Sequence, residues 1–95
     1  MERLAFEWDE SKDRVNQRKH GISFSESRGV FFDDLAVEFY DDKHSDWGNR
    51  FLLLGMSPKK RVLLVCHCMR QGGSVIRIIS ARKASSSEKK LYPGA

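Results

Sequence analysis

Residues 61–83 read RVLLVCHCMRQGGSVIRIISARK, which is two aliphatic runs on either side of a glycine-containing turn. The runs, 61–69 and 74–83, are rich in valine, leucine and isoleucine, and Gln71-Gly72-Gly73 between them is a typical turn sequence. The segment therefore predicts an antiparallel hairpin. Arg77 lies in the middle of the second strand, and a charge at such a position indicates that one face of the sheet is open to solvent.

The length of this turn determines which residues of the two strands face each other. A three-residue loop pairs His67 with Arg77, whereas a two-residue loop pairs Cys68 with Arg77 and His67 with Ile78. The second register sets a polar residue against an apolar one on both faces. We favour the first register, because the faces of a strand should sort by polarity, and it places His67 beside Arg77 on an open face.

Two helices are predicted before the strands. The first has Asp9 as its N-cap and ends at Gly21, after cations that suit the negative end of a helix dipole. Ser23 and Glu26 form a capping-box pattern, which predicts a second helix that ends near residues 33–34.

The other strands are predicted at 36–40 and 50–56, with a polar loop over 41–48 and a proline-containing turn over 57–60. Ser85 and Glu88 form another capping-box pattern, at the start of a short basic helix that ends near Tyr92. The sequence thus predicts an α+β fold in one domain, residues 1–95. Two N-terminal helices would pack on a four-stranded antiparallel sheet, with a short C-terminal helix.

Charge is unevenly distributed along the chain. Residues 59–95 contain nine of the 17 Lys and Arg residues and one acid, for a formal charge of +8, whereas residues 1–58 carry −4. This distribution suits a nucleic-acid partner better than the net charge of +4 does by itself.

The two cysteines, Cys66 and Cys68, would point to the same face of one strand, where they cannot pair without distorting the backbone. His67 would point to the other face, and no second cluster supplies further ligands, so we expect no metal site and no cofactor. Residues 1–3 do not resemble a signal peptide, and no apolar run could span a bilayer. We therefore expect a cytoplasmic protein without membrane contacts.

A histidine beside an arginine on an open face suits RNA cleavage through the 2′-hydroxyl. Imidazole transfers protons near neutral pH, and guanidinium binds phosphate oxygens. We assign proton transfer to His67, and stabilisation of the phosphate and transition state to Arg77 and Arg82. This chemistry requires no metal. The predicted RNA contacts are Lys83, Lys89 and Tyr92, and a secondary site comprises His20 and Lys19.

Several of these residues also fit structural roles. Arg77 suits a solvated strand position, His67 a cross-strand pair, His20 a helix end and Lys89 an exposed helix surface. The functional interpretation rests on their expected proximity.

Four separate segments resemble, in this order and spacing, the BrnT family of bacterial type II toxins. They are Phe6-Glu7-Trp8-Asp9 with Lys12 and Asn16, then Lys19 to Phe24, then Asp33-Asp34, and last Arg77 to Ala84. The resemblance implies a RelE-like fold and a ribonuclease that inhibits translation. It also implies a BrnA-type ribbon-helix-helix antitoxin, with two toxins around an antitoxin dimer that alone contacts promoter DNA.

Two functions from other classes remain open. In one, the chain is a non-catalytic module that binds an antitoxin within a DNA-binding autorepressor complex. In the other, it is a RelE-like toxin that acts on gyrase. Growth arrest on expression without the partner separates a toxin from the module, and RNA integrity separates the two kinds of toxin.

Overall fold

The computed structural model describes residues 4–45 and 48–94. Residues 1–3, on which the signal-peptide prediction rests, and residues 46–47 of the predicted polar loop lie outside this range. In the described residues, no helix is long and apolar enough to cross a membrane.

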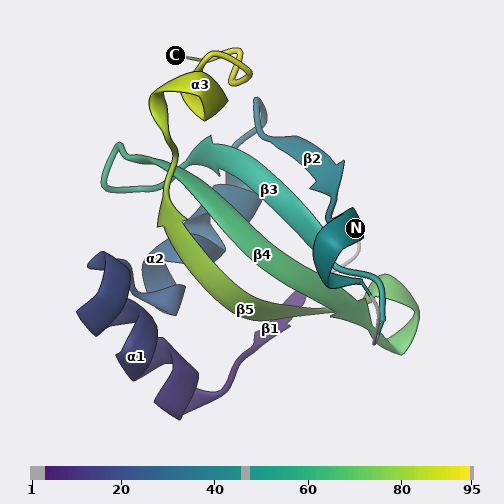
Figure 1. Cartoon of the computed structure of the whole chain (residues 1–95). Coiled ribbons are helices and arrows are strands. Elements are labelled where there is room, and N and C mark those ends of the chain that lie inside the picture. The colour runs from purple at the N-terminus through teal and green to yellow at the C-terminus, as the bar shows by residue number, and fades with distance from the viewer. Residues whose placement is uncertain (1–3, 46–47, 95) are drawn as a thin grey trace.

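The described chain forms a five-stranded mixed sheet with the strand order β1-β5-β4-β3-β2 (Figure 1). The strands are β1 (Ala5–Glu7), β2 (Val37–Tyr40), β3 (Phe51–Met56), β4 (Val62–Arg70) and β5 (Val75–Lys83). The helices are α1 (Glu10–His20), α2 (Phe24–Gly29) and α3 (Ser86–Lys89), with 3-10 turns η1 (Val30–Phe32), η2 (Asp42–His44) and η3 (Gln71–Gly73). The α+β class is confirmed.

The prediction of four antiparallel strands was wrong, because β1 adds a fifth strand that runs parallel to β5. It pairs Glu7 with Arg77. A strand of three residues is too short to show an alternating pattern, and its pairing depends on an edge formed some seventy residues later in the sequence.

The predicted caps of α1 are confirmed. The Asp9 carboxylate accepts a hydrogen bond from the Ser11 N–H at 2.8 Å, and Gly21 closes the helix in the left-handed region with φ 71°. The side chain of Asn16 in the middle of α1 is buried and bonds to the backbone of Ala81 in both directions, at 2.9 and 3.1 Å. β1 pairs only with residues 75–77 of β5. Further along the same edge of β5, at Ala81, the side chain of Asn16 takes the place of a neighbouring strand as hydrogen-bond partner.

The cap of α2 is confirmed at Ser23, whose hydroxyl accepts from the Glu26 N–H at 3.0 Å. The side chain of Glu26 does not turn back to the cap as expected. It accepts from the Ser57 hydroxyl at 2.6 Å and from the Arg61 guanidinium, and so links α2 to the β3–β4 turn. At α3, the predicted capping box between Ser85 and Glu88 is present in full.

The two faces of the sheet are covered differently. Behind the strands in Figure 1, α2 and η1 cover one face, and its core consists of Ile22, Phe24, Val30, Leu53, Leu63, Val65, Ile76, Ile78 and Ala81. On the opposite face, Ala84 and Tyr92 pack on Leu54 and Leu64 at one end, and η2 lies beside the central strands further along. Among the described residues, two hollows remain on this second face.

The register predicted for the β4–β5 hairpin was wrong. Cys68 pairs with Arg77 and His67 with Ile78, as in the register that we disfavoured. A bulge follows at residues 66–67, after which Cys66 pairs with Ser80. His67 and Arg77 therefore lie on opposite faces, because neighbouring positions along a strand alternate.

Candidate active site

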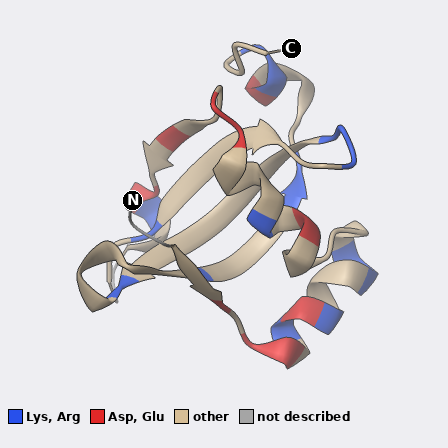
Figure 2. Cartoon of the chain, turned by 180° about the vertical axis from the view of Figure 1, so that it is seen from behind, with Lys and Arg blue, Asp and Glu red and all other residues tan. Residues whose placement is uncertain are grey.

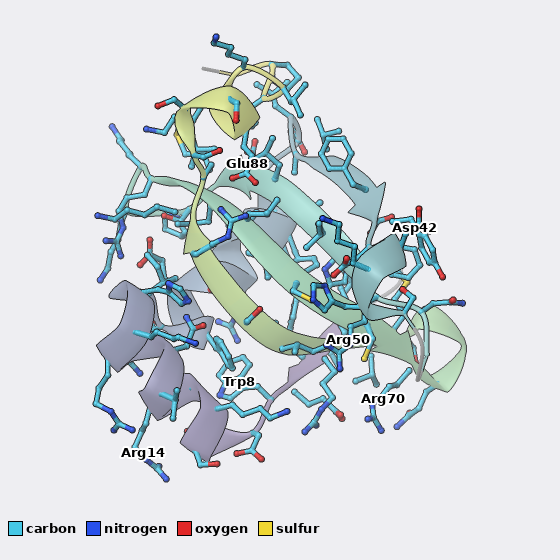
Figure 3. The ribbon with its side chains drawn as sticks, in the orientation of Figure 1. Trp8, Arg14, Asp42, Arg50, Arg70 and Glu88 are labelled. Carbon is cyan, nitrogen blue, oxygen red and sulfur yellow. The ribbon has the colours of Figure 1, made fainter. Side chains whose placement is uncertain are left out.

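A groove of about 780 Å³ crosses the partly covered face between α3, η2 and the end of α1. Leu52, Leu64 and Cys66 of the central strands lie along it. Its charged and titratable side chains include His20, Asp41, His44, Arg50, Arg82 and Glu88. We call this hollow the acid–base groove. Figure 3 shows Arg50 and Glu88 over the sheet face toward the viewer.

An aspartate orients one histidine of this groove. Nδ1 of His44 lies 3.1 Å from Oδ2 of Asp41, and the His44 side chain is 64% exposed against 10% for Asp41. Since an ionised carboxylate only accepts hydrogen bonds, Nδ1 is the donor, and Nε2 of a neutral imidazole is then an acceptor. The pair has the arrangement of a general base whose tautomer is fixed by a carboxylate.

Arg82 enters the same groove from β5 and is held by Glu88 of α3. Two parallel hydrogen bonds of 2.8 Å join the guanidinium to the carboxylate. The Arg82 guanidinium lowers the pKa of Glu88 to about 2, and the carboxylate in turn raises the pKa of Arg82. Arg82 is thus a fixed cation that is still 44% exposed.

A second hollow of about 470 Å³ adjoins the first, and Arg50 lines both. Lys12, Arg70 and Arg77 line it as well, and we call it the cationic hollow. Oε2 of Glu7 lies 2.9 Å from NH1 of Arg77 and 3.5 Å from Nε of Arg70. Arg77, in the middle of β5, therefore has its ion-pair partner in β1, a strand that the sequence did not predict.

The structure places His67 in the core, with a side chain that is 0% exposed. Its ring packs against Phe31 and Phe51, and its Nε2 lies 3.2 Å from Oε1 of Glu38. Burial lowers the pKa of His67, against the opposing effect of the hydrogen bonds to the Val65 carbonyl and Glu38. His67 is thus a buried histidine that does not line the acid–base groove, and the predicted pairing of His67 with Arg77 was wrong.

The predicted RNA contacts lie in several places. Tyr92 is buried, and its hydroxyl donates to Oδ2 of Asp33 at 2.6 Å, which raises the pKa of Tyr92 to about 12. Lys83 is exposed but pairs with Leu63, whose side chain belongs to the core on the α2 face. Lys89 is exposed on α3. His20 and Lys19 together line a smaller hollow of about 240 Å³ between α1 and β5, and His20 also lines the acid–base groove.

The charge separation seen along the sequence does not produce one uniformly basic face. Four arginines of the basic half pair with acids from other elements, namely Arg61 with Glu26, Arg70 and Arg77 with Glu7, and Arg82 with Glu88. From behind, α1 carries acidic and basic residues close together, and the β3–β4 turn is basic (Figure 2). Acidic and basic side chains are mixed along the acid–base groove, whereas the cationic hollow is lined by basic side chains without a lining carboxylate.

The sequence was compared with protein families and known structures. It matches, over residues 8–88, the family described as the ribonuclease toxin BrnT of type II toxin-antitoxin systems. This chain belongs to the BrnT family of ribonuclease toxins. The structure is similar to the crystal structure of the Brucella abortus ribonuclease toxin BrnT, with a TM-score of 0.64 and 23% identity over 90% of this chain and 100% of that one. That likeness supports the fold. No curated protein matches significantly by sequence.

Sequence reasoning missed three side chains of the acid–base groove, namely Asp41, His44 and Arg50. The first two lie in the loop that we interpreted only as polar and exposed. Their spacing of three residues was an available signal, because side chains three apart meet on one helical turn, and η2 is such a turn. Arg50 carried no such signal, because it reaches the groove only through the position of β3, which begins at the next residue.

Cys66 and Cys68 are both unpaired, as expected. Burial raises the pKa of the Cys66 thiol, so this cysteine is a poor nucleophile at neutral pH. In the described part of the chain, no three His, Cys, Asp or Glu side chains are grouped as metal ligands.

Proposed function

We propose that this BrnT-family toxin is an endoribonuclease that cleaves RNA in the acid–base groove without a metal ion and so inhibits translation. The observation that carries the proposal is the Asp41–His44 pair, which lies in one groove with a second histidine and two arginines. Imidazole and guanidinium together can supply the proton transfers and the charge stabilisation that this reaction needs.

In the proposed reaction, Nε2 of His44 takes the proton of a ribose 2′-hydroxyl. The 2′-oxygen forms a bond to phosphorus as the bond from phosphorus to the 5′-oxygen breaks. Protonated His20 donates a proton to the departing 5′-oxygen, and Arg50 and Arg82 bind the non-bridging phosphate oxygens. The products are a 2′,3′-cyclic phosphate and a 5′-hydroxyl end. Unlike the assignment from sequence, this one replaces His67 by His44, because the His67 ring is buried.

Arg82 is suited to its proposed role because Glu88 fixes it before RNA arrives. Both carboxylate oxygens are used by Arg82, and Oε1 also accepts from the Ser85 N–H at 2.8 Å. A guanidinium has five N–H donors, so the bidentate bond to Glu88 leaves donors free for phosphate. Arg77, to which we assigned stabilisation of the phosphate and transition state from the sequence, is proposed instead to contact RNA in the cationic hollow.

The chemistry is tested by incubating purified protein with end-labelled RNA in excess EDTA. We expect fragments with 2′,3′-cyclic phosphate and 5′-hydroxyl ends. Cleavage that EDTA abolishes and added Mg²⁺ restores would contradict metal independence. If RNA stays intact although expression arrests growth, a target such as gyrase would replace RNA in the proposal.

We further propose that a BrnA-type ribbon-helix-helix antitoxin neutralises this chain as a complex of two toxins with one antitoxin dimer. Membership of a toxin-antitoxin family supports an antitoxin partner, and the dimeric partner sets the proposed stoichiometry. Expression of the toxin alone should arrest growth, and co-expression of the neighbouring gene should restore it. Light scattering of the purified complex measures the stoichiometry, and a 1:1 mass would contradict it.

A further inference from the structure

The cationic hollow is lined by basic side chains, which suit an anionic ligand. Lys12, Arg50, Arg70 and Arg77 line it, together with Gly48, Asn49, Cys68, Met69 and Ile79. Among the described residues, none of these lining side chains carries a carboxylate. Like charges brought together in one hollow repel each other unless an anion is bound between them.

We propose that the cationic hollow is a second phosphate-binding subsite, which holds the RNA backbone at a phosphate other than the one that is cleaved. This inference rests on the proposed function, and it assigns the reacting phosphate to the acid–base groove. The second subsite determines affinity and the position of the strand. It takes no part in proton transfer.

The arginines of the hollow are held in place without being neutralised. A single carboxylate oxygen, Oε2 of Glu7, contacts both Arg77 and Arg70. One negative charge is thus shared by two guanidinium groups, and each retains N–H donors that face no acid in this pairing. Side chains that are already ordered lose less entropy on binding a phosphate, so the arrangement favours binding.

The two hollows are connected through Arg50, which lines both of them. A strand whose scissile phosphate lies in the acid–base groove can therefore continue into the cationic hollow along the same sheet face. Met69, which is 44% exposed, lies in the hollow and offers apolar surface for a neighbouring base. A single-stranded RNA, with its bases unstacked from each other, suits such a track.

The test measures binding of a 2′-O-methylated oligonucleotide of about twelve nucleotides, a length within the range of roughly 4–16 that single-strand-binding folds cover. This RNA cannot be cleaved because it has no free 2′-hydroxyl. The variants are Arg70→Gln and Arg77→Gln. Arg14→Gln is the control with the same change in charge, since Arg14 is exposed on α1 and points away from both hollows (Figure 3).

We expect Arg70→Gln and Arg77→Gln each to weaken binding about tenfold, as removal of a charged hydrogen bond does. The slope of log affinity against log salt should become shallower by about 0.7 for each phosphate that the variant no longer neutralises, and Arg14→Gln should change neither quantity. With a dinucleotide, which has one phosphate, the effect of Arg70→Gln should shrink to that of the control. Arg70 is 56% exposed, so its variant does not depend on a buried side chain for folding.

Three results would overturn the subsite. Unchanged affinity in Arg70→Gln and Arg77→Gln would do so. Equal weakening for the dinucleotide and the longer RNA would place the hollow within the reaction centre instead. Weakened antitoxin binding with unchanged RNA binding would make the ligand an acidic protein segment. Cleavage of the unmodified RNA by the wild type is measured in parallel, and its absence would count against the proposed function itself.

Discussion

His67 shows how far the environment of one residue can depart from the pattern of its neighbours. Its strand neighbours and the arginine ten residues later suggested a polar face, but the ring lies between Phe31 and Phe51 in the core. The sequence could not reveal this, because the residues that enclose the ring come from η1 and β3. Arg77 faces the other side, where its partner Glu7 comes from a strand that the sequence did not predict.

The burial of His67 predicts a pH dependence of stability. Its pKa is lowered in the folded state, so below the usual value of 6.5 the unfolded chain binds the proton more readily. The free energy of unfolding should therefore fall as pH drops from 6.5 through the lowered pKa. Urea unfolding at pH about 7.5 and about 5.5 measures this for the wild type and for His67→Phe. An equal pH dependence in both proteins would contradict the prediction.

Tyr92 predicts a loss of stability for Tyr92→Phe. The substitution removes the hydroxyl that donates to Asp33 at 2.6 Å, and a hydrogen bond to a charged group contributes about 1.5–3 kcal/mol. Asp33 keeps its bond from the Met56 N–H, so no acceptor is orphaned. The control is Tyr40→Phe, which removes only the exposed bond to Asn49. If both variants unfold at the same urea concentration, Tyr92 has no such structural role.

At the scale of elements, local signals were predicted well and non-local pairing was not. The caps at Asp9, Gly21, Ser23 and Ser85 depend on residues within a few positions of each other, and all four are present. The hairpin register depends on a four-residue connection between Arg70 and Val75 and on the bulge beyond it. Neither the connection nor the bulge has a distinctive sequence signature. The rule that polar residues share a face favoured the wrong register, because it sought a polar neighbour for Arg77 on β4, whereas the partner of Arg77 is Glu7 of β1.

The packing of α1 against β5 predicts that Asn16→Ala is strongly destabilising. The variant leaves the N–H and carbonyl of Ala81 without their partner, and also the Ile22 carbonyl, which Asn16 reaches at 2.8 Å. We expect the free energy of unfolding to decrease by roughly 3 kcal/mol or more, because three buried polar groups lose their partner and each costs about 1–3 kcal/mol when left unpaired. Gln17→Ala, on the exposed side of α1, should change the free energy of unfolding by less than about 0.5 kcal/mol.

Hydrogen exchange at the Ala81 amide distinguishes this mechanism from general destabilisation. In Asn16→Ala, the Ala81 amide should exchange faster than its neighbours on β5 do, because the loss of protection begins locally. Uniform acceleration along β5 would indicate instead that Asn16 contributes only to global stability.

At the scale of the whole molecule, the two faces of the sheet differ in how they are covered. One face forms the main core with α2, and in the described residues the other is covered less fully, by the C-terminal segment at one end and by η2 further along. The family and its ribonuclease activity could be expected from sequence, because the matching segments are local motifs. The composition of the groove could not, because it joins residues from α1, η2, four strands and α3.

The most direct test of the proposed site compares single-turnover RNA cleavage by wild type, His44→Ala and His67→Gln in EDTA. The last variant is measured at a temperature where circular dichroism shows it folded. We predict that His44→Ala is slower by about 10²–10⁴-fold, the usual contribution of a general base, and that folded His67→Gln stays within about tenfold of the wild type. Cleavage by His44→Ala at the wild-type rate, together with loss of activity in folded His67→Gln, would contradict the proposed site and return proton transfer to the buried histidine.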